Sequence, residues 1–89
     1  MSGVAATIKV MPADADTDLN DLKNKIREAI PASGQINGEI VEQPIAFGLK
    51  ALIVTIVVED DEGGIDPIEE ALNAIPEAES VSVTNLDRI

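Results

Sequence analysis

Residues 49–59, Leu-Lys-Ala-Leu-Ile-Val-Thr-Ile-Val-Val-Glu, carry the strongest strand signal in this chain of 89 residues. Nearly every position from Ala51 to Val58 is apolar, whereas a strand with one solvated face alternates apolar and polar side chains. The stretch therefore predicts the central strand of a sheet, covered at least partly on both faces. It is too short to span a bilayer.

The residues nearer the N-terminus predict a strand and then a helix. The strand covers residues 4–10, where aliphatic side chains at every second position share one face: Val4, Ala6, Ile8 and Val10. The helix has an aliphatic stripe with helical spacing: Leu19, Leu22, Ile26 and Ile30. Asp16, Thr17 or Asp18 is suited to cap its start, and Pro31 ends it.

A weaker strand pattern lies between this helix and the central strand. It runs from Gln35 to about Ile45, with Gly38 at a position suited to a bulge. Pro44 is typical of an edge strand, because proline cannot donate a hydrogen bond to a neighbouring strand. The chain then turns at Phe47-Gly48.

An acidic turn containing glycine follows the central strand and leads to a second helix. We expect Asp66 to cap this helix, with Pro67 at its first position and Glu69 completing a capping box. Its apolar stripe has four members: Ile68, Ala71, Leu72 and Ile75. Pro76 ends the helix, and residues 80–84, Ser-Val-Ser-Val-Thr, predict a last strand with one polar face.

The two halves of the chain repeat each other at an offset of 45 residues, so that Ala29-Ile30-Pro31 corresponds to Ala74-Ile75-Pro76. Two βαβ units with right-handed crossovers interleave into one β-α-β-β-α-β domain. We therefore expect an α+β, ferredoxin-like sandwich over residues 1–89, with a four-stranded antiparallel sheet and two helices on one face. Apolar side chains remain for the other face, and we expect part of them to be exposed for a partner.

The composition excludes several classes of function. The chain has 17 acidic and 6 basic residues and a net charge of -11, which argues against direct binding of nucleic acid. Cysteine and histidine are absent, which removes disulfides, thiol nucleophiles and the usual general base. Met1 to Met11 has no targeting pattern, so we expect a protein of the cytoplasm with no membrane anchor. Phe47 is the only aromatic residue, so the core must be aliphatic.

The candidate metal, phosphate and catalytic patterns fail when their spacing is checked. Asp14, Asp16 and Asp18 match the spacing of the first three ligands of a calcium-binding EF-hand loop. The alternative interpretation is that they cap the start of the first helix. Leu19 stands where that loop needs glycine, and Lys25 where it needs its last carboxylate. No phosphate-binding glycine loop occurs, and no serine has a histidine to activate it. We expect no catalytic residue, metal site, cofactor or small-molecule substrate.

Basic residues are scarce enough to be informative. Three are expected on the solvated face of the first helix with Asp21 and Glu28: Lys23, Lys25 and Arg27. The other three are isolated in the sequence: Lys9, Lys50 and Arg88. Residues 46–89 carry ten acids but only two bases, Lys50 and Arg88. Each is either a surface charge in an acidic field or a contact to an anionic ligand on a partner.

Two stretches resemble a known family. Residues 43–52, Gln-Pro-Ile-Ala-Phe-Gly-Leu-Lys-Ala-Leu, followed by a strand ending Val58-Glu59-Asp60-Asp61, resemble the signature of translation elongation factor 1-beta. The C-terminus, Asp87-Arg88-Ile89, is similar to that of the family, where a basic residue precedes a final aliphatic one. The short length is similar to the archaeal form.

The resemblance implies a guanine nucleotide exchange factor for elongation factor 1-alpha, the GTPase that delivers aminoacyl-tRNA to the ribosome. In eukaryotic relatives the penultimate lysine reaches toward the magnesium site of the GTPase, and the phenylalanine of the Phe-Gly turn engages the partner. Carried over, these roles fall to Arg88 and Phe47. An arginine is planar and forked, so it pairs with a carboxylate or phosphate but fits a magnesium-sized cavity less readily than lysine.

The candidate partner-binding set has five members: Phe47, Gly48, Lys50, Arg88 and Ile89. We expect the free protein to be a monomer that makes and breaks no covalent bond. Other classes stay open: a ferredoxin-like regulatory module that dimerises and binds a small molecule, an assembly protein, or a small enzyme. Whether Phe47 faces the core or the partner also stays open.

Overall fold

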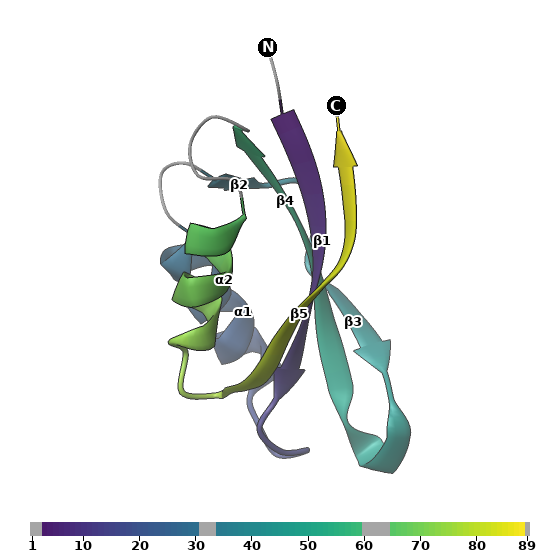
Figure 1. The fold of residues 1–89 in the computed structure, drawn as a ribbon. Coiled ribbons are helices and arrows are strands. Elements are labelled where there is room, and N and C mark those ends of the chain that lie inside the picture. Colours follow the sequence, from purple (N-terminus) through teal and green to yellow (C-terminus); the bar gives the residue numbers. More distant parts are fainter. Residues whose placement is uncertain (1–2, 31–33, 60–64, 89) are drawn as a thin grey trace.

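The computed structural model describes residues 3–30, 34–59 and 65–88, with the side chains of Glu59 and Arg88 outside that description (Figure 1). The elements follow in the order β1 (Gly3–Pro12), α1 (Leu19–Ala29), β2 (Gly34–Ile36), β3 (Val41–Pro44), β4 (Lys50–Glu59), α2 (Asp66–Asn73) and β5 (Ala78–Arg88). A short 3-10 turn, η1 (Ala46–Gly48), joins β3 to β4. The expected turn after β4 and the final Ile89 lie outside the described residues.

The predicted α+β sandwich is confirmed, with β1 and β4 at the centre of an antiparallel sheet of order β2-β4-β1-β5. Both helices cover the same face of the sheet (Figure 1). The sheet has five strands rather than four, because the second expected strand is divided into β2 and β3, which both pair with β4. Gly38 lies between them with a left-handed φ of 81°, a conformation that glycine adopts without steric cost.

The core lies between the helices and the covered face of the sheet. The sheet and helices contribute fully buried aliphatic side chains to it: Ala6, Ile8, Val10, Leu52, Val54, Ile56, Leu22, Ile26, Ile68 and Leu72. These residues alternate along β1 and β4 and recur with helical spacing on α1 and α2, as the sequence pattern predicts. The core is therefore built from aliphatic residues, and Phe47 is not part of it.

The two helices start in different ways. Asp18 caps α1, since its Oδ1 accepts hydrogen bonds from the backbone N–H groups of Asn20 (3.0 Å) and Asp21 (3.2 Å). The prediction that Asp66 caps α2 is wrong: the N-cap is Ile65, which makes no side-chain capping bond. The backbone of Ile65 is already helical, and its carbonyl accepts the N–H of Glu69 at 3.0 Å. Asp66 is thus inside the first turn, where it contributes only its charge.

The last strand, β5, is longer than the predicted 80–84, and its pairing with β1 shifts register at two places, between Thr7 and Ile8 and between Met11 and Pro12. Thr7 of β1 pairs with Asn85, and the next residue, Ile8, pairs with Val83. Thr84 is therefore an extra residue in β5 with no counterpart in β1, as in a β-bulge. The Thr84 hydroxyl donates to the carbonyl oxygen of Thr7 at 3.2 Å. In residues 3–30, 34–59 and 65–88, no helix is long and apolar enough to cross a membrane.

Candidate partner-binding site

The β3–β4 hairpin extends beyond the rest of the sheet. Pairing between β1 and β4 ends at Val10 with Leu52, whereas β3 continues to pair with β4 as far as Pro44 with Lys50. The hairpin therefore projects from the body of the molecule (Figure 1). Its end is closed by a hydrogen bond from the Ile45 N–H to the Leu49 carbonyl, 2.8 Å long.

Phe47 lies at the tip of this hairpin and is 95% exposed. Its φ of 63° is left-handed, a region that bulky residues rarely occupy, and Gly48 follows with a φ of 76°. The sequence left open whether Phe47 faces the core or a partner, and its exposure shows that it does not face the core. An aromatic ring that is both exposed and held on a strained backbone is typical of a contact residue.

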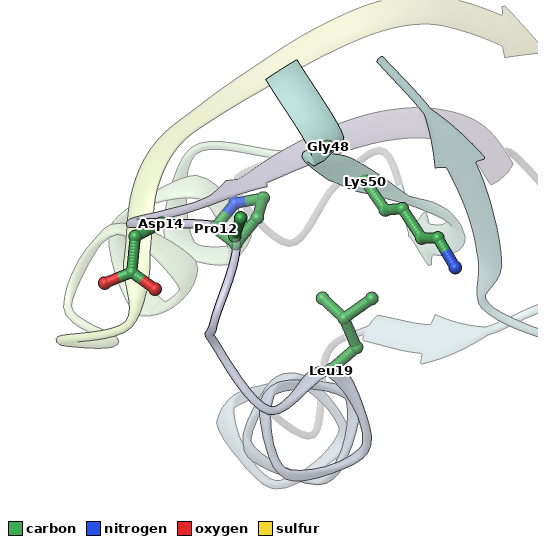
Figure 2. Close-up of a pocket in the computed structure, with 6 residues that line it drawn as sticks. Pro12, Asp14, Leu19, Gly48 and Lys50 are labelled. Carbon is green, nitrogen blue, oxygen red and sulfur yellow. The ribbon is translucent and has the colours of Figure 1, made fainter. Parts of the chain in front are cut away.

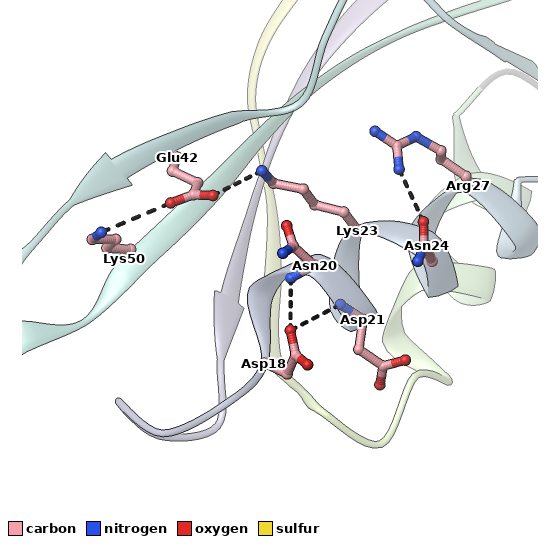
Figure 3. Close-up of polar contacts among 8 residues, drawn as sticks. All are labelled: Asp18, Asn20, Asp21, Lys23, Asn24, Arg27, Glu42 and Lys50. Carbon is pink, nitrogen blue, oxygen red and sulfur yellow. Dashed lines mark hydrogen bonds and ion pairs between the residues drawn. The ribbon is translucent and has the colours of Figure 1, made fainter.

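Lys50 stands at the base of the same tip and is not isolated, contrary to the sequence interpretation. Its Nζ lies 3.8 Å from Oε1 of Glu42 on β3, and Lys23 of α1 places its own Nζ 2.7 Å from the other oxygen, Oε2 (Figure 3). The hydrogen bond and charge of Lys23, with a further contribution from Lys50, hold the pKa of Glu42 below its ordinary value of 4.5. One carboxylate thus joins the hairpin to the helix layer.

The other cations of α1 follow the expected pattern in part. Lys25 pairs with Asp21 at 3.1 Å, one helical turn away, as predicted. It also pairs with Glu77, which lies between α2 and β5. Arg27 donates to the side-chain oxygen of Asn24 at 3.1 Å, and no ion pair is described for Glu28 within the described ranges. The helix is therefore tied by ion pairs to β3 on one side of the sheet and to the connection before β5 on the other, rather than only solvated.

A hollow of about 270 Å³ separates the hairpin from the β1–α1 connection. Gly48 and Lys50 line it on the hairpin side, and Pro12, Asp14, Ala15 and Leu19 on the other. Figure 2 shows Leu19 extending from α1 toward the hairpin across this space. The tip is thus not packed directly against the body of the protein.

Arg88 lies at the opposite end of the molecule from Phe47. On β5 it pairs with Val4, which in turn pairs with Val58 on β4. Lys50 and Val58 are eight residues apart on β4, or about 26 Å at the rise of an extended strand. The structure therefore brings Phe47, Gly48 and Lys50 together but leaves Arg88 at the far end. Ile89 lies outside the described residues.

The uncovered face of the sheet carries a groove that sequence reasoning did not locate. A volume of about 560 Å³ is lined by Lys9, Val41, Glu42, Gln43, Pro44, Ile53 and Thr84. Val41 is 56% exposed, and Ile53 is partly exposed beside it on β4. Residues 51–58 predicted apolar side chains on both faces of β4. The contribution of β3 could not be predicted, because it depends on the register that pairs Val41 with Ile53.

The aspartates before α1 are engaged in local backbone contacts. Asp14 accepts a hydrogen bond from the N–H of Asp16 at 2.9 Å, and Asp18 caps the helix. In the described part of the chain, no group of three or more acidic side chains is close enough to hold a metal ion. The capping explanation of this cluster is confirmed for Asp18.

Comparison with known proteins places this architecture in a family. The family model described as the EF-1 guanine nucleotide exchange domain matches residues 5–89. Elongation factor 1-beta of Methanosarcina barkeri is 55% identical over 89 residues and that of Halobacterium salinarum 45% identical, each match covering 100% of both chains. Elongation factor 1-beta of Methanosphaera stadtmanae is 52% identical, covering 100% of this chain and 99% of its own. The chain belongs to the EF-1 guanine nucleotide exchange domain family, and the predicted resemblance is confirmed.

Proposed function

We propose that this protein binds elongation factor 1-alpha in the cytoplasm and promotes release of GDP and loading of GTP during translation elongation. The observation that carries the proposal is the family match over residues 5–89, together with the exposed, strained Phe47 in the stretch of sequence that resembles the family signature. The whole chain acts as a single exchange-factor domain, monomeric when free.

The proposed contact set has two parts. Phe47, Gly48 and Lys50 form one contact at the hairpin, and Arg88 with Ile89 forms the other at the far end of the sheet. The separation of about 26 Å between Lys50 and the Arg88 end supports a partner that is held at two places. In this arrangement the hairpin docks, while Arg88 reaches toward the magnesium and phosphate site of the GTPase.

Nucleotide exchange needs no covalent chemistry from this chain. A factor that binds the nucleotide-free GTPase more tightly than the loaded form lowers nucleotide affinity by the same coupling free energy. A ~1000-fold weakening requires about 4 kcal/mol of differential binding, which a few contacts supply. Magnesium and nucleotide are in this view ligands of the partner. The net charge of -11 steers the protein toward a basic surface and raises the association rate.

The test is release of labelled GDP from elongation factor 1-alpha, followed with and without this protein. We expect faster release that saturates with the concentration of the added protein. Binding is measured in parallel by calorimetry. If the two proteins bind and release is not accelerated, the protein is an assembly partner and the proposal fails.

A further inference from the structure

We propose that Glu42 is a positioning residue, which fixes the angle of the β3–β4 hairpin against α1 and so places Phe47 for its contact with the GTPase. The inference rests on the proposed function, because the contact of Phe47 belongs to it. Glu42 lies outside both stretches that resemble the family, residues 43–52 and the C-terminal Asp87-Arg88-Ile89, so its role is additional to theirs.

The hairpin needs such a support. At Lys50 and Ala51, on the hairpin side of Leu52, β4 no longer pairs with β1, and among the described residues its strand partner there is β3 alone. A two-stranded ribbon on its own is marginally stable and twists more than a wider sheet. Ala51 of this ribbon is fully buried. Nearer the tip, however, a hollow of about 270 Å³ lies between Gly48 and Leu19, so the tip itself has no direct packing against α1 as a second support (Figure 2).

Glu42 supplies the missing connection at the root of the ribbon. It pairs with Leu52, which is fully buried beneath the helices, so its side chain lies on the helix side of the sheet. There it accepts the hydrogen bond from Lys23 of α1 at 2.7 Å and lies 3.8 Å from Lys50 of β4 (Figure 3). Three elements therefore meet at one carboxylate: α1, β3 and β4.

The contact is better suited to fixing a position than to stabilising the fold. The Lys23 side chain is 18% exposed and that of Glu42 35%, and partly exposed ion pairs add little to global stability. Phe47, however, lies five residues beyond Glu42, so a small rotation at the root becomes a larger displacement at the tip. Contacts at a binding site must be held to within about 0.5 Å to be productive.

The experiment compares variants in the GDP-release assay. Glu42→Gln and Lys23→Met remove the pair from either side, and we expect each to lower the second-order rate constant of release by about threefold to tenfold. Lys23→Arg keeps the charge and should retain the wild-type rate within about twofold. Glu39→Gln is the matched control, since it makes the same charge change three residues away with no ion pair described for Glu39 in the described ranges. Thermal unfolding checks that every variant folds. If Glu42→Gln does not fold, the comparison is made with Lys23→Met instead.

A double-mutant cycle separates positioning from a merely structural role. In a Phe47→Ala background, Glu42→Gln should cause no further loss, because the residue acts through Phe47. Additive losses, or an unchanged rate in Glu42→Gln alone, would overturn the inference. If the wild type itself fails to accelerate release, the proposed function fails instead. NMR order parameters of the Phe47 and Gly48 amides in the free protein then test the positioning role of Glu42 independently of exchange. A decrease in Glu42→Gln supports that role, and no change refutes it.

Discussion

Phe47 occupies a state that stability alone does not explain. Burying a phenylalanine contributes about 1.5–3 kcal/mol, and this ring is 95% exposed. A left-handed backbone costs a residue with a side chain roughly 1–2 kcal/mol, and φ at this position is 63°. Both terms oppose placing phenylalanine here, so its presence points to a use outside the folded chain.

Phe47→Ala should therefore separate function from stability. Because the ring makes little contact with the protein, we expect the free energy of unfolding to change by less than about 0.5 kcal/mol. The rate of GDP release from elongation factor 1-alpha should fall by tenfold or more, on the order of a lost interface anchor. Urea unfolding and the release assay measure the two quantities. A destabilisation above about 1.5 kcal/mol would show that the ring packs in the fold.

Glu42 gives an acid-dependent contribution whose sign follows from its lowered pKa. Lys23 and Lys50 favour the charged carboxylate in the folded state, so the contribution is present above the ordinary pKa of 4.5 and is lost as the pH falls through the lower, folded-state pKa. We expect the difference in unfolding free energy between wild type and Glu42→Gln to shrink as the pH falls below 4.5. Urea unfolding at a series of pH values tests this. A difference that stays constant to the end of the series would mean that the carboxylate is not paired.

At the scale of elements, the two helices show how similar sequences at an N-terminus give different starts. Asp18 has an extended backbone and accepts two N–H groups, whereas Ile65 is already helical when Asp66 begins the turn. Both aspartates precede an apolar stripe, yet only one supplies a hydrogen bond to the helix end. Buried aliphatic side chains hold both helices, Leu22 and Ile26 in α1 and Ile68 and Leu72 in α2, and α1 has in addition a side chain that caps its start.

Asp18→Ala and Asp66→Ala form a matched pair that tests this difference. Loss of a cap that accepts two hydrogen bonds should cost roughly 1 kcal/mol of unfolding free energy, with a range of about 0.5–2 kcal/mol. Asp66→Ala removes only a charge near the helix start and should cost about 0.3–1 kcal/mol at low salt, less in high salt. Unfolding curves in low and high salt distinguish the two. Equal, salt-sensitive losses would argue that Asp18 acts only by charge.

At the scale of the whole molecule, the elongated shape of 42 × 20 × 18 Å separates the two proposed contacts. The central pair β1–β4 connects them, with Val4 near the Arg88 end and Leu52 at the root of the hairpin. These strands are buried on the helix side and carry the core, so the distance between the contacts is set by the most rigid part of the fold.

Arg88→Ala should slow exchange more than it weakens binding, since this end is proposed to act on the nucleotide site and the hairpin to dock. The dissociation constant and the maximal release rate are measured separately. Because the two ends are far apart, the effects of Arg88→Ala and Phe47→Ala on binding should add within about 0.3–0.5 kcal/mol. Comparable losses of binding and of rate in Arg88→Ala would mean that Arg88 only docks.

Much of the fold follows from local patterns in the sequence. Alternation along 4–10, the almost continuous apolar run 51–58 and the stripes at Leu22 and Ile68 predict both central strands and both helices, because each pattern reflects which side chains are buried. Two features could not be predicted, because each depends on the backbone conformation of one residue and not on hydrophobic periodicity. The strand is divided at Gly38, whose φ is left-handed, and the N-cap of α2 is Ile65, whose backbone is already helical. Composition drew attention to Phe47 and the resemblance supplied the site motif, whereas the exposure of the ring is known only from the structure.

The sequence indicated the pairing of Lys25 with Asp21 within α1, but it did not indicate the charge partners that come from other elements. Lys50 appeared isolated because its nearest acid along its own strand is Glu59, whereas Glu42 reaches it across the β3–β4 register. Lys23 pairs with the same carboxylate from 19 residues away. Pairings of this kind depend on tertiary geometry, and side-chain type at a given spacing does not determine them.

The aliphatic core has a practical consequence for spectroscopy. The chain contains no tryptophan, tyrosine or histidine, so Phe47 alone supplies aromatic side-chain protons. The aromatic region of its proton NMR spectrum should therefore contain the signals of one ring, located at the tip of the hairpin. In a complex with a deuterated partner, shifts and line widths of those signals would report directly on whether the tip is engaged. The same lack of indole leaves a tryptophan fluorescence signal of any partner unobscured.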